Sequence, residues 1–307
     1  MIKPKRFNSK HFLSISDLTN EEILYLFELA QAFKKGHFLP QSSRKMLGLI
    51  FDKPSTRTRV SFQAAISRLG GSSFELNSNT SQIGRGEPIR DTARVLSRYC
   101  DVLAIRTYKQ SDLEEYASWF AKPVVNALTD IEHPCQALAD YFTIQEEFSD
   151  FSNIVLTFIG DGNNVAHSLI LCGSLLDVEV RIACPKTYEP SPQILKKAMD
   201  LNNNFKITIT HDINSAVRGA NVLYTDVWSS MGEENGKQIK DKDFKGYSID
   251  SDLVNKADKD AIVLHCLPAY RGKEINEDVI ESRKSRIFDQ AENRMHIQQA
   301  LLSCLLS

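Results

Sequence analysis

Short apolar segments alternate with longer amphipathic segments along most of the chain, and this alternation restricts the fold more than any other feature. In the first half, residues 45–51 (KMLGLIF) predict a buried strand, and residues 60–69 (VSFQAAISRL) predict a helix that ends at two glycines. Residues 102–105 and 124–127 predict two further short strands. Because strands that alternate with helices pair in parallel, we expect a parallel sheet covered by helices.

The second half repeats this alternation after a long helical segment, residues 133–148, which has Pro134 in its first turn. The predicted elements that follow are strands at 154–159, 178–183, 205–209, 221–224 and 261–265, and helices at 165–176, 192–201 and 290–306. A chain of 307 residues is long for one core, since domains average about 150 residues. We therefore predict an α/β protein of two doubly wound domains, joined by the helix at 133–148.

Charges and cysteines restrict the surroundings in which the chain acts. Lys and Arg total 37 against 39 Asp and Glu, so no broad basic surface predicts nucleic-acid binding. The basic N-terminus lacks the apolar core of a signal peptide, and no segment approaches the ~18 apolar residues of a membrane span. The six cysteines form no CxxC pair, and all except Cys266 predict small buried side chains in a reducing compartment. We expect a cytoplasmic protein that binds neither nucleic acid nor membrane.

Ser55, Thr56, Arg57 and Thr58 stand between the first predicted strand and its helix. In parallel sheets, ligands bind beyond the carboxyl ends of the strands, where helix N-termini offer unpaired N–H groups. Hydroxyls, N–H groups and a guanidinium in one turn match the acceptor oxygens of a phosphate. The cluster therefore predicts a phosphate site, although Ser55 by itself is equally typical of a helix cap.

A second turn, residues 159–165 (IGDGNNV), follows a predicted strand as a dinucleotide-binding loop does. It lacks the third glycine, no acidic residue ends the next strand, and no GxxxxGK[ST] motif occurs in the chain. We therefore predict no nucleotide here, but a tight turn that directs Asn163 and Asn164 at a small polar ligand.

Three further clusters stand at predicted strand or helix ends. His133 opens the long helix as a donor to an anion or carbonyl oxygen, Asp226 begins DVWSSMG after a strand, and Cys266 lies in HCLP after another strand. Each has a simpler interpretation, namely a capping histidine, a solvated loop aspartate and a core cysteine. Their joint occurrence after strand ends favours a binding site.

The motifs STRTR, HPCQ, DVWSSMG and HCLP, in this order and spacing, resemble those of the aspartate/ornithine carbamoyltransferase family over essentially the whole chain. The DVWSSMG segment and the loop at 81–84 (SQIG), where aspartate-type members usually carry a lysine, are similar to the ornithine branch. The resemblance implies attack by the δ-amine of L-ornithine on the carbonyl carbon of carbamoyl phosphate. The products would be L-citrulline and phosphate, with no metal and no cofactor.

The resemblance also implies which residues bind carbamoyl phosphate. They are Ser55, Thr56, Arg57, Thr58, Gln82, Arg106, His133, Gln136, Cys266, Leu267 and Arg294. The STRTR residues and Gln82 would hold the phosphate, while Arg106 and His133, with Arg57 and Thr58, would donate to the carbonyl oxygen as charge develops on it. Carbonyl groups near Gln136 and Leu267 would orient the carbamoyl nitrogen, and Arg294 would close the site.

For ornithine, the resemblance implies that Asn164 and main-chain N–H groups near Met231 take the α-carboxylate, and that Asp226 and Ser230 take the α-ammonium. The δ-amine of ornithine is similar to that of lysine, which has a pKa of about 10.4. At neutral pH it must therefore lose a proton before it attacks. Cys266 and the adjacent carbonyl group are implied to accept its hydrogens, with simple packing as the alternative. The implied catalytic residues are Arg57, Arg106, His133, Asp226 and Cys266.

By the same resemblance, residues 1–132 and 290–307 form the carbamoyl phosphate domain, 133–149 a linking helix and 150–289 the ornithine domain. The C-terminal helix is the second link, and the chain is expected to form a homotrimer in which the Gln82 loop enters the neighbouring active site.

Two alternative functions stay open. One is a carbamoyltransferase for acetylornithine, putrescine or aspartate, and the other is an inactive binding or scaffold protein. The same groups serve arginine biosynthesis and citrulline breakdown.

Overall fold

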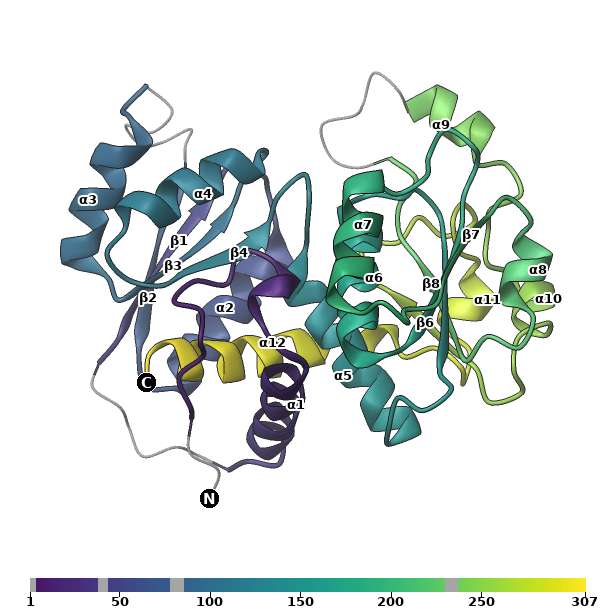
Figure 1. The fold of residues 1–307 in the computed structure, drawn as a ribbon, viewed down its shortest axis with the longest axis horizontal. Coiled ribbons are helices and arrows are strands. Elements are labelled where there is room, and N and C mark those ends of the chain that lie inside the picture. The colour runs from purple at the N-terminus through teal and green to yellow at the C-terminus, as the bar shows by residue number, and fades with distance from the viewer. Residues whose placement is uncertain (1–3, 38–43, 78–85, 230–236) are drawn as a thin grey trace. The chain divides into compact units, whose positions relative to one another are not determined.

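The computed structural model describes residues 4–37, 44–77, 86–229 and 237–307 (Figure 1). The chain divides into two compact units. Unit 1 comprises Met1–Leu138 and Asn293–Ser307, and unit 2 comprises Ala139–Glu292. Two helices run across the division, α5 (Pro134–Phe148) and α12 (Ile287–Leu305). None of the described helices is long and apolar enough to cross a membrane.

Unit 1 is built on a four-stranded parallel sheet in the order β2-β1-β3-β4. Its strands are β1 (Met46–Phe51), β2 (Ser72–Asn77), β3 (Val102–Arg106) and β4 (Val124–Leu128). Its helices are η1 (Ile15–Asp17), α1 (Asn20–Lys34), α2 (Thr56–Arg68), α3 (Ile89–Tyr99) and α4 (Gln110–Trp119). Strands β1, β3 and β4 are buried because they are apolar on both faces, and they pack with α3 and α4 in one core that includes Ile50, Leu103 and Leu113.

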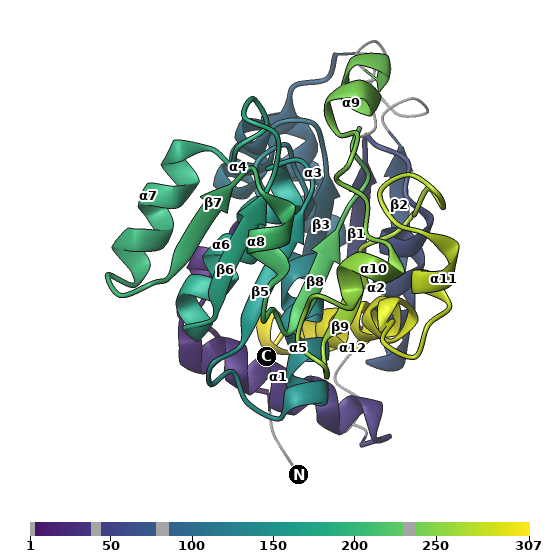
Figure 2. The ribbon, with the colours of Figure 1, turned by 90° about the vertical axis from the view of Figure 1, so that its right-hand side faces the viewer.

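Unit 2 is built on a five-stranded parallel sheet in the order β7-β6-β5-β8-β9, which Figure 2 shows from one side to the other. Its strands are β5 (Val155–Ile159), β6 (Glu179–Ala183), β7 (Ile207–Thr210), β8 (Val222–Thr225) and β9 (Ile262–His265). Its helices are α6 (Asn164–Leu176), α7 (Pro192–Leu201), α8 (Ile213–Val217), α9 (Lys237–Asp243), α10 (Ser251–Val254) and α11 (Glu277–Ile280). The predicted α/β class with two parallel sheets is confirmed.

Each sheet contains one point at which the strand order reverses, between β1 and β3 in unit 1 and between β5 and β8 in unit 2. In sheets of this kind, ligands generally bind beyond the carboxyl ends of the two strands at the reversal point. The STRTR turn follows β1 and Arg106 ends β3, whereas Asn163 follows β5 and Asp226 follows β8. The topology therefore brings polar residues that are far apart in sequence to one edge of each sheet.

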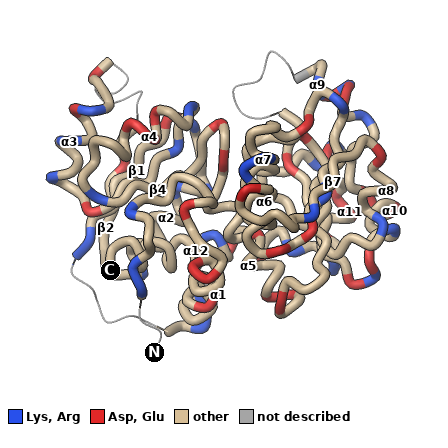
Figure 3. Tube along the Cα trace, in the orientation of Figure 1, with Lys and Arg blue, Asp and Glu red and all other residues tan. Residues whose placement is uncertain are grey.

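Element boundaries differ from the prediction at a few places. Helix α2 begins at Thr56 rather than at residue 60, because Ser55 caps it and its first turn is polar. Strand β2 was not predicted. It is an edge strand that is only partly buried, so its sequence SSFELN lacks an apolar run. Figure 3 shows basic and acidic residues interspersed in both units, in agreement with the near-equal totals of the two charges.

Candidate active site

The STRTR turn forms the N-terminus of α2 at the reversal point of the unit 1 sheet. Ser55 Oγ accepts a hydrogen bond from the backbone N–H of Thr58 at 3.2 Å, so Ser55 is the helix cap. The first turn of α2 carries no acidic residue. Its positive dipole end is therefore not neutralised by the helix itself, which suits an anion.

Arg294 reaches the same turn from the C-terminal helix α12. Its Nη2 donates to Oγ1 of Thr58 at 2.7 Å, and both side chains are buried. The two residues lie 236 positions apart in sequence. A guanidinium that is fixed in this way adds a buried positive charge beside the STRTR turn.

His133 lies immediately before α5 and is almost completely buried. Burial, and then the positive charges of Arg294, Arg106 and Arg57, hold the pKa of His133 well below its ordinary value of 6.5. The imidazole is therefore neutral at pH 7, with one nitrogen that donates and one that accepts. Three guanidiniums and a neutral imidazole form an environment for negative charge.

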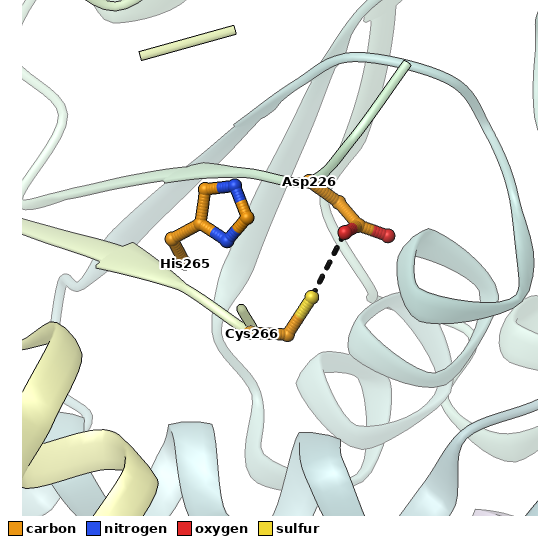
Figure 4. A group of neighbouring side chains, drawn as sticks. All are labelled: Asp226, His265 and Cys266. Carbon is orange, nitrogen blue, oxygen red and sulfur yellow. Dashed lines mark hydrogen bonds between the residues drawn. The ribbon is translucent and has the colours of Figure 1, made fainter. Parts of the chain in front are cut away.

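In unit 2, Asp226 is the centre of a second cluster, directly after β8. Its Oδ1 accepts from Sγ of Cys266 at 2.9 Å and from the N–H of Val227 at 2.7 Å, and its Oδ2 accepts from Nδ2 of Asn163 at 3.1 Å. Figure 4 shows the Cys266 sulfur directed at this carboxylate. Asp226 is only 7% exposed. A buried carboxylate with neutral hydrogen-bond donors is suited to a cationic amine.

The HCLP turn that carries Cys266 is held by a buried network. The N–H of Leu267 donates to Nδ1 of His265 at 2.8 Å, and Nε2 of His265 contacts Oε1 of Glu274 at 3.1 Å. Leu267 has a φ of 58°, which costs a residue with a side chain about 1–3 kcal/mol unless its surroundings fix it. The network therefore holds the Leu267 backbone in a conformation that it would not adopt alone.

Asp226, His265 and Cys266 offer possible metal ligands within 4.8 Å of one another. However, Nδ1 of His265 accepts from Leu267 and Nε2 donates to Glu274, so neither ring nitrogen has a lone pair directed at a cation. The Cys266 thiol and the Asp226 carboxylate bond each other instead. The donor set does not fit a resident metal.

The predicted site residues that the structure describes fall into two groups. Unit 1 contains Ser55, Thr56, Arg57, Thr58, Arg106, His133, Gln136 and Arg294, and unit 2 contains Asn164, Asp226, Cys266 and Leu267. Gln82, Ser230 and Met231 lie outside the described residues. The prediction that Cys266 differs from the other cysteines is confirmed, since the other five are buried.

The sequence did not indicate two contacts of Asn163. Its amide oxygen caps α6, and its Nδ2 donates to Asp226. The sequence also gave no role to Glu274, because a glutamate that follows HCLP by several residues has no signal of its own. Its buried contact with His265 becomes apparent only in the fold.

Two doubly wound units, each with polar side chains gathered where its strand order reverses, define the class, a two-domain α/β enzyme. Residues 10–146 match the family model described as aspartate/ornithine carbamoyltransferase, carbamoyl-P binding domain, and residues 152–305 match the Asp/Orn binding domain. The chain belongs to the aspartate/ornithine carbamoyltransferase family.

Relatives with the ornithine activity in their names match all or nearly all of the chain. An ornithine carbamoyltransferase of Prochlorococcus marinus subsp. pastoris is 67% identical over 307 residues, which is 100% of both chains. The solved structure of ornithine carbamoyltransferase from Pyrococcus furiosus is similar with a TM-score of 0.92 at 44% identity, over 96% of each chain. The anabolic ornithine carbamoyltransferase from Campylobacter jejuni has a TM-score of 0.91 at 43% identity, over 97% of this chain and 99% of that one.

Proposed function

We propose that the chain is an ornithine carbamoyltransferase, which transfers the carbamoyl group of carbamoyl phosphate to the δ-amine of L-ornithine. The observation that carries this proposal is the buried carboxylate of Asp226, bonded by the thiol of Cys266 and the amide of Asn163. The carboxylate can accept hydrogen bonds from an α-ammonium, and the thiol lies beside it. A site for aspartate would need additional positive charge instead, because that substrate carries two carboxylates.

The phosphate group of carbamoyl phosphate binds in this proposal to residues of unit 1. It accepts from the hydroxyls and N–H groups of Ser55, Thr56, Arg57 and Thr58 at the N-terminus of α2, with Gln82 as a further donor. Arg294 fixes the Thr58 hydroxyl through their 2.7 Å hydrogen bond. The phosphate thus meets donors that are already oriented before it arrives.

The carbonyl oxygen accepts hydrogen bonds from Arg106 and His133, supported by Arg57 and Thr58. Because His133 is neutral, it stabilises the developing oxyanion as a donor and does not protonate it. Carbonyl groups near Gln136 and Leu267 orient the carbamoyl nitrogen. The Leu267 backbone is held for this purpose by His265 and Glu274.

Ornithine binds in this proposal to the residues of unit 2. Asp226 and Ser230 take the α-ammonium, and Asn164 takes the α-carboxylate together with N–H groups near Met231. The δ-amine donates hydrogen bonds to Cys266 and to the Leu267 carbonyl. It loses one proton to the Cys266 sulfur as the thiol passes its own proton to Oδ1 of Asp226, and it then attacks the carbonyl carbon. A carbon–nitrogen bond forms, and the carbon–oxygen bond to phosphate breaks. The phosphate leaves with the bonding electrons, and the tetrahedral nitrogen releases its remaining extra proton.

A colorimetric citrulline assay on the purified protein tests this function. Carbamoyl phosphate is offered with ornithine and, in parallel, with acetylornithine, putrescine or aspartate, each with detection suited to its product. Citrulline from ornithine alone is the expected result. Turnover only with another amine would mean that the unit 2 residues bind that amine instead of ornithine. No turnover with any of the four amines would favour an inactive scaffold.

We further propose a homotrimer in which the Gln82 loop contributes to the neighbouring active site. Helices α2 and α3 of unit 1 expose apolar side chains, with Val60 54%, Val95 47% and Tyr99 69% exposed. Such side chains are typical of surfaces that a partner covers. Analytical ultracentrifugation with dilution assays tests this, and a fully active monomer would refute it.

A reducing compartment, the cytoplasm, is the proposed location, since the six cysteines are free thiols and the chemistry uses Cys266 as a thiol. Arginine biosynthesis is the proposed role. Cell fractionation tests the location, and a test for arginine auxotrophy after gene deletion tests the role. Citrulline breakdown with growth independent of this gene would contradict the biosynthetic role.

A further inference from the structure

The side chain of Asn163 makes two kinds of contact with its two polar atoms. Its Oδ1 accepts from the N–H groups of Val165 at 2.9 Å and Ala166 at 3.3 Å, so it caps α6. Its Nδ2 donates to Oδ2 of Asp226 at 3.1 Å. The cap identifies the amide oxygen and the amide nitrogen of Asn163, because only the oxygen can accept from the two N–H groups.

We propose that Asn163 is a positioning residue of the ornithine site. It uses the α6 cap to fix its own amide and thereby fixes the carboxylate plane of Asp226. This inference rests on the proposed function, in which Asp226 takes the α-ammonium. Asn163 itself needs no contact with the substrate.

The turn that carries Asn163 is itself held in place by contacts of the two residues before Asn163. The N–H of Gly162 donates to the carbonyl of Tyr188 at 2.8 Å, and a Cβ at Gly162 would lie 2.4 Å from the backbone nitrogen of Pro190. Next to it, Asp161 Oδ2 pairs with Nζ of Lys240 at 2.6 Å, and both side chains are at most 15% exposed. Asn163 is therefore presented from a rigid support.

The geometry shows what the contact achieves. Cys266 and the N–H of Val227 both bond Oδ1 of Asp226, which leaves Oδ2 with the Asn163 amide as its described partner. A carboxylate oxygen has two lone pairs, so Oδ2 keeps one that is available to an ammonium group. Without Asn163, Asp226 can rotate, and the oxygens that face the thiol and the ammonium are no longer defined.

Cap-preserving substitutions separate positioning from capping. Asn163→Ser keeps a preferred cap hydroxyl but is too short to reach Asp226, and Asn163→Asp keeps both cap and size but replaces the donor by an acceptor. Asn163→Ala removes both functions. The matched control is Asp212→Ser, a cap exchange at α8 after the edge strand β7, two strands away from β5.

Steady-state kinetics provide the first readout. For Asn163→Ser we expect kcat/KM for ornithine to fall about 10- to 100-fold, the range for loss of a hydrogen bond to a charged group. The KM for carbamoyl phosphate and the Tm stay near those of the wild type. For Asn163→Asp we expect a larger loss, because two adjacent carboxylates repel each other. The control Asp212→Ser should keep the wild-type kcat/KM for ornithine and the wild-type KM for carbamoyl phosphate.

Alkylation of Cys266 by iodoacetamide, followed by peptide mass spectrometry, provides a readout that needs no turnover. When Asp226 is no longer fixed, the hydrogen bond from the thiol is weakened, so we expect alkylation several-fold faster in Asn163→Ser than in the wild type. Asp226→Asn serves as the reference for a lost partner. Wild-type protein that makes no citrulline would refute the proposed function, and this alkylation comparison would still decide whether Asn163 fixes Asp226.

The inference is overturned if Asn163→Ser keeps the wild-type kcat/KM for ornithine and the wild-type alkylation rate while Asn163→Ala only lowers the Tm. Asn163 would then be a helix cap and nothing more.

Discussion

Unit 1 and unit 2 share one architecture, yet the polar clusters at their reversal points have opposite electrostatic character. In unit 1, the positive charges of Arg57, Arg106 and Arg294 act on a single buried imidazole, His133. In unit 2, the central charge is the carboxylate of Asp226, whose partners among the described residues are neutral donors. A common fold thus provides the place for a site, and a few side chains after the strand ends decide which charge it accepts.

The comparison also separates two ways of fixing a side chain. Unit 1 uses long-range contacts, as Arg294 of α12 bonds Thr58 of α2 across 236 residues. Unit 2 uses the loops of neighbouring strands, as Asn163 after β5 and Cys266 after β9 both bond Asp226 after β8. If each site depends on its own charge, removal of that charge should affect one substrate more than the other.

The largest expected effect follows removal of a charge from unit 1. We expect Arg106→Met to lower kcat/KM for carbamoyl phosphate about 100- to 1,000-fold, because a preorganised donor to the oxyanion is lost. Arg106→Lys should fall between this variant and the wild type, since lysine keeps the charge but not the planar fork. Arg68→Met, at the exposed end of α2, is the control. A wild-type rate for Arg106→Met would remove it from the site.

The second effect concerns the charge of unit 2. Asp226→Asn should lower kcat/KM for ornithine about 100-fold, because the ammonium loses its charged partner. The affinity for inorganic phosphate, measured by isothermal titration calorimetry, should stay unchanged. An equal loss of phosphate affinity would show that the two sites are not chemically separate.

A smaller effect is expected at the thiol. Cys266→Ala should lower kcat/KM for ornithine about 10-fold and alter its pH profile, since the hydrogen-bonded partner of Asp226 is removed. Cys184→Ala, which removes a buried cysteine of the same unit, is the control for packing. If Cys266→Ala keeps both the rate and the pH profile, then Cys266 only packs.

The smallest effect concerns His133 and stability. Because the pKa of His133 is lower in the folded chain than its ordinary value of 6.5, the unfolded chain binds more protons as pH falls through about 6.5. Its contribution to the free energy of unfolding is therefore complete above that pH and declines below it. Urea denaturation at about pH 7.5 and about pH 5.5 should show a smaller decline for His133→Asn than for the wild type. Equal declines would mean that His133 is not held neutral by its surroundings.

Much of the fold followed from the sequence because buried strands of a parallel sheet are continuous apolar runs. β1, β5 and β8 were expected within one or two residues of their observed bounds. The edge strand β2 was missed because an edge strand that is only partly buried has no such run. The start of helix α2 was predicted too late because the first turn, STRTR, is polar and lacks an apolar pattern. The same polarity predicts a phosphate site.

The members of the site could be named from motifs, but their contacts could not. Asn163 and Asp226 are 63 residues apart, and nothing in either motif indicates that the amide of one meets the carboxylate of the other. That contact depends on β5 and β8 being neighbours, which is a property of the strand order. Local patterns predict which chemistry is present, and topology determines which groups meet.

The central claim is that Asp226 holds the α-ammonium, so that the δ-nitrogen attacks carbamoyl phosphate. The most direct measurement follows the reaction by NMR, with a stable-isotope carbon label in carbamoyl phosphate and a nitrogen label at either the δ- or the α-position of ornithine. We predict one-bond carbon–nitrogen coupling in the product from δ-labelled ornithine and none from α-labelled ornithine. Coupling to the α-nitrogen, or release of the carbon label without any coupling, would contradict the account.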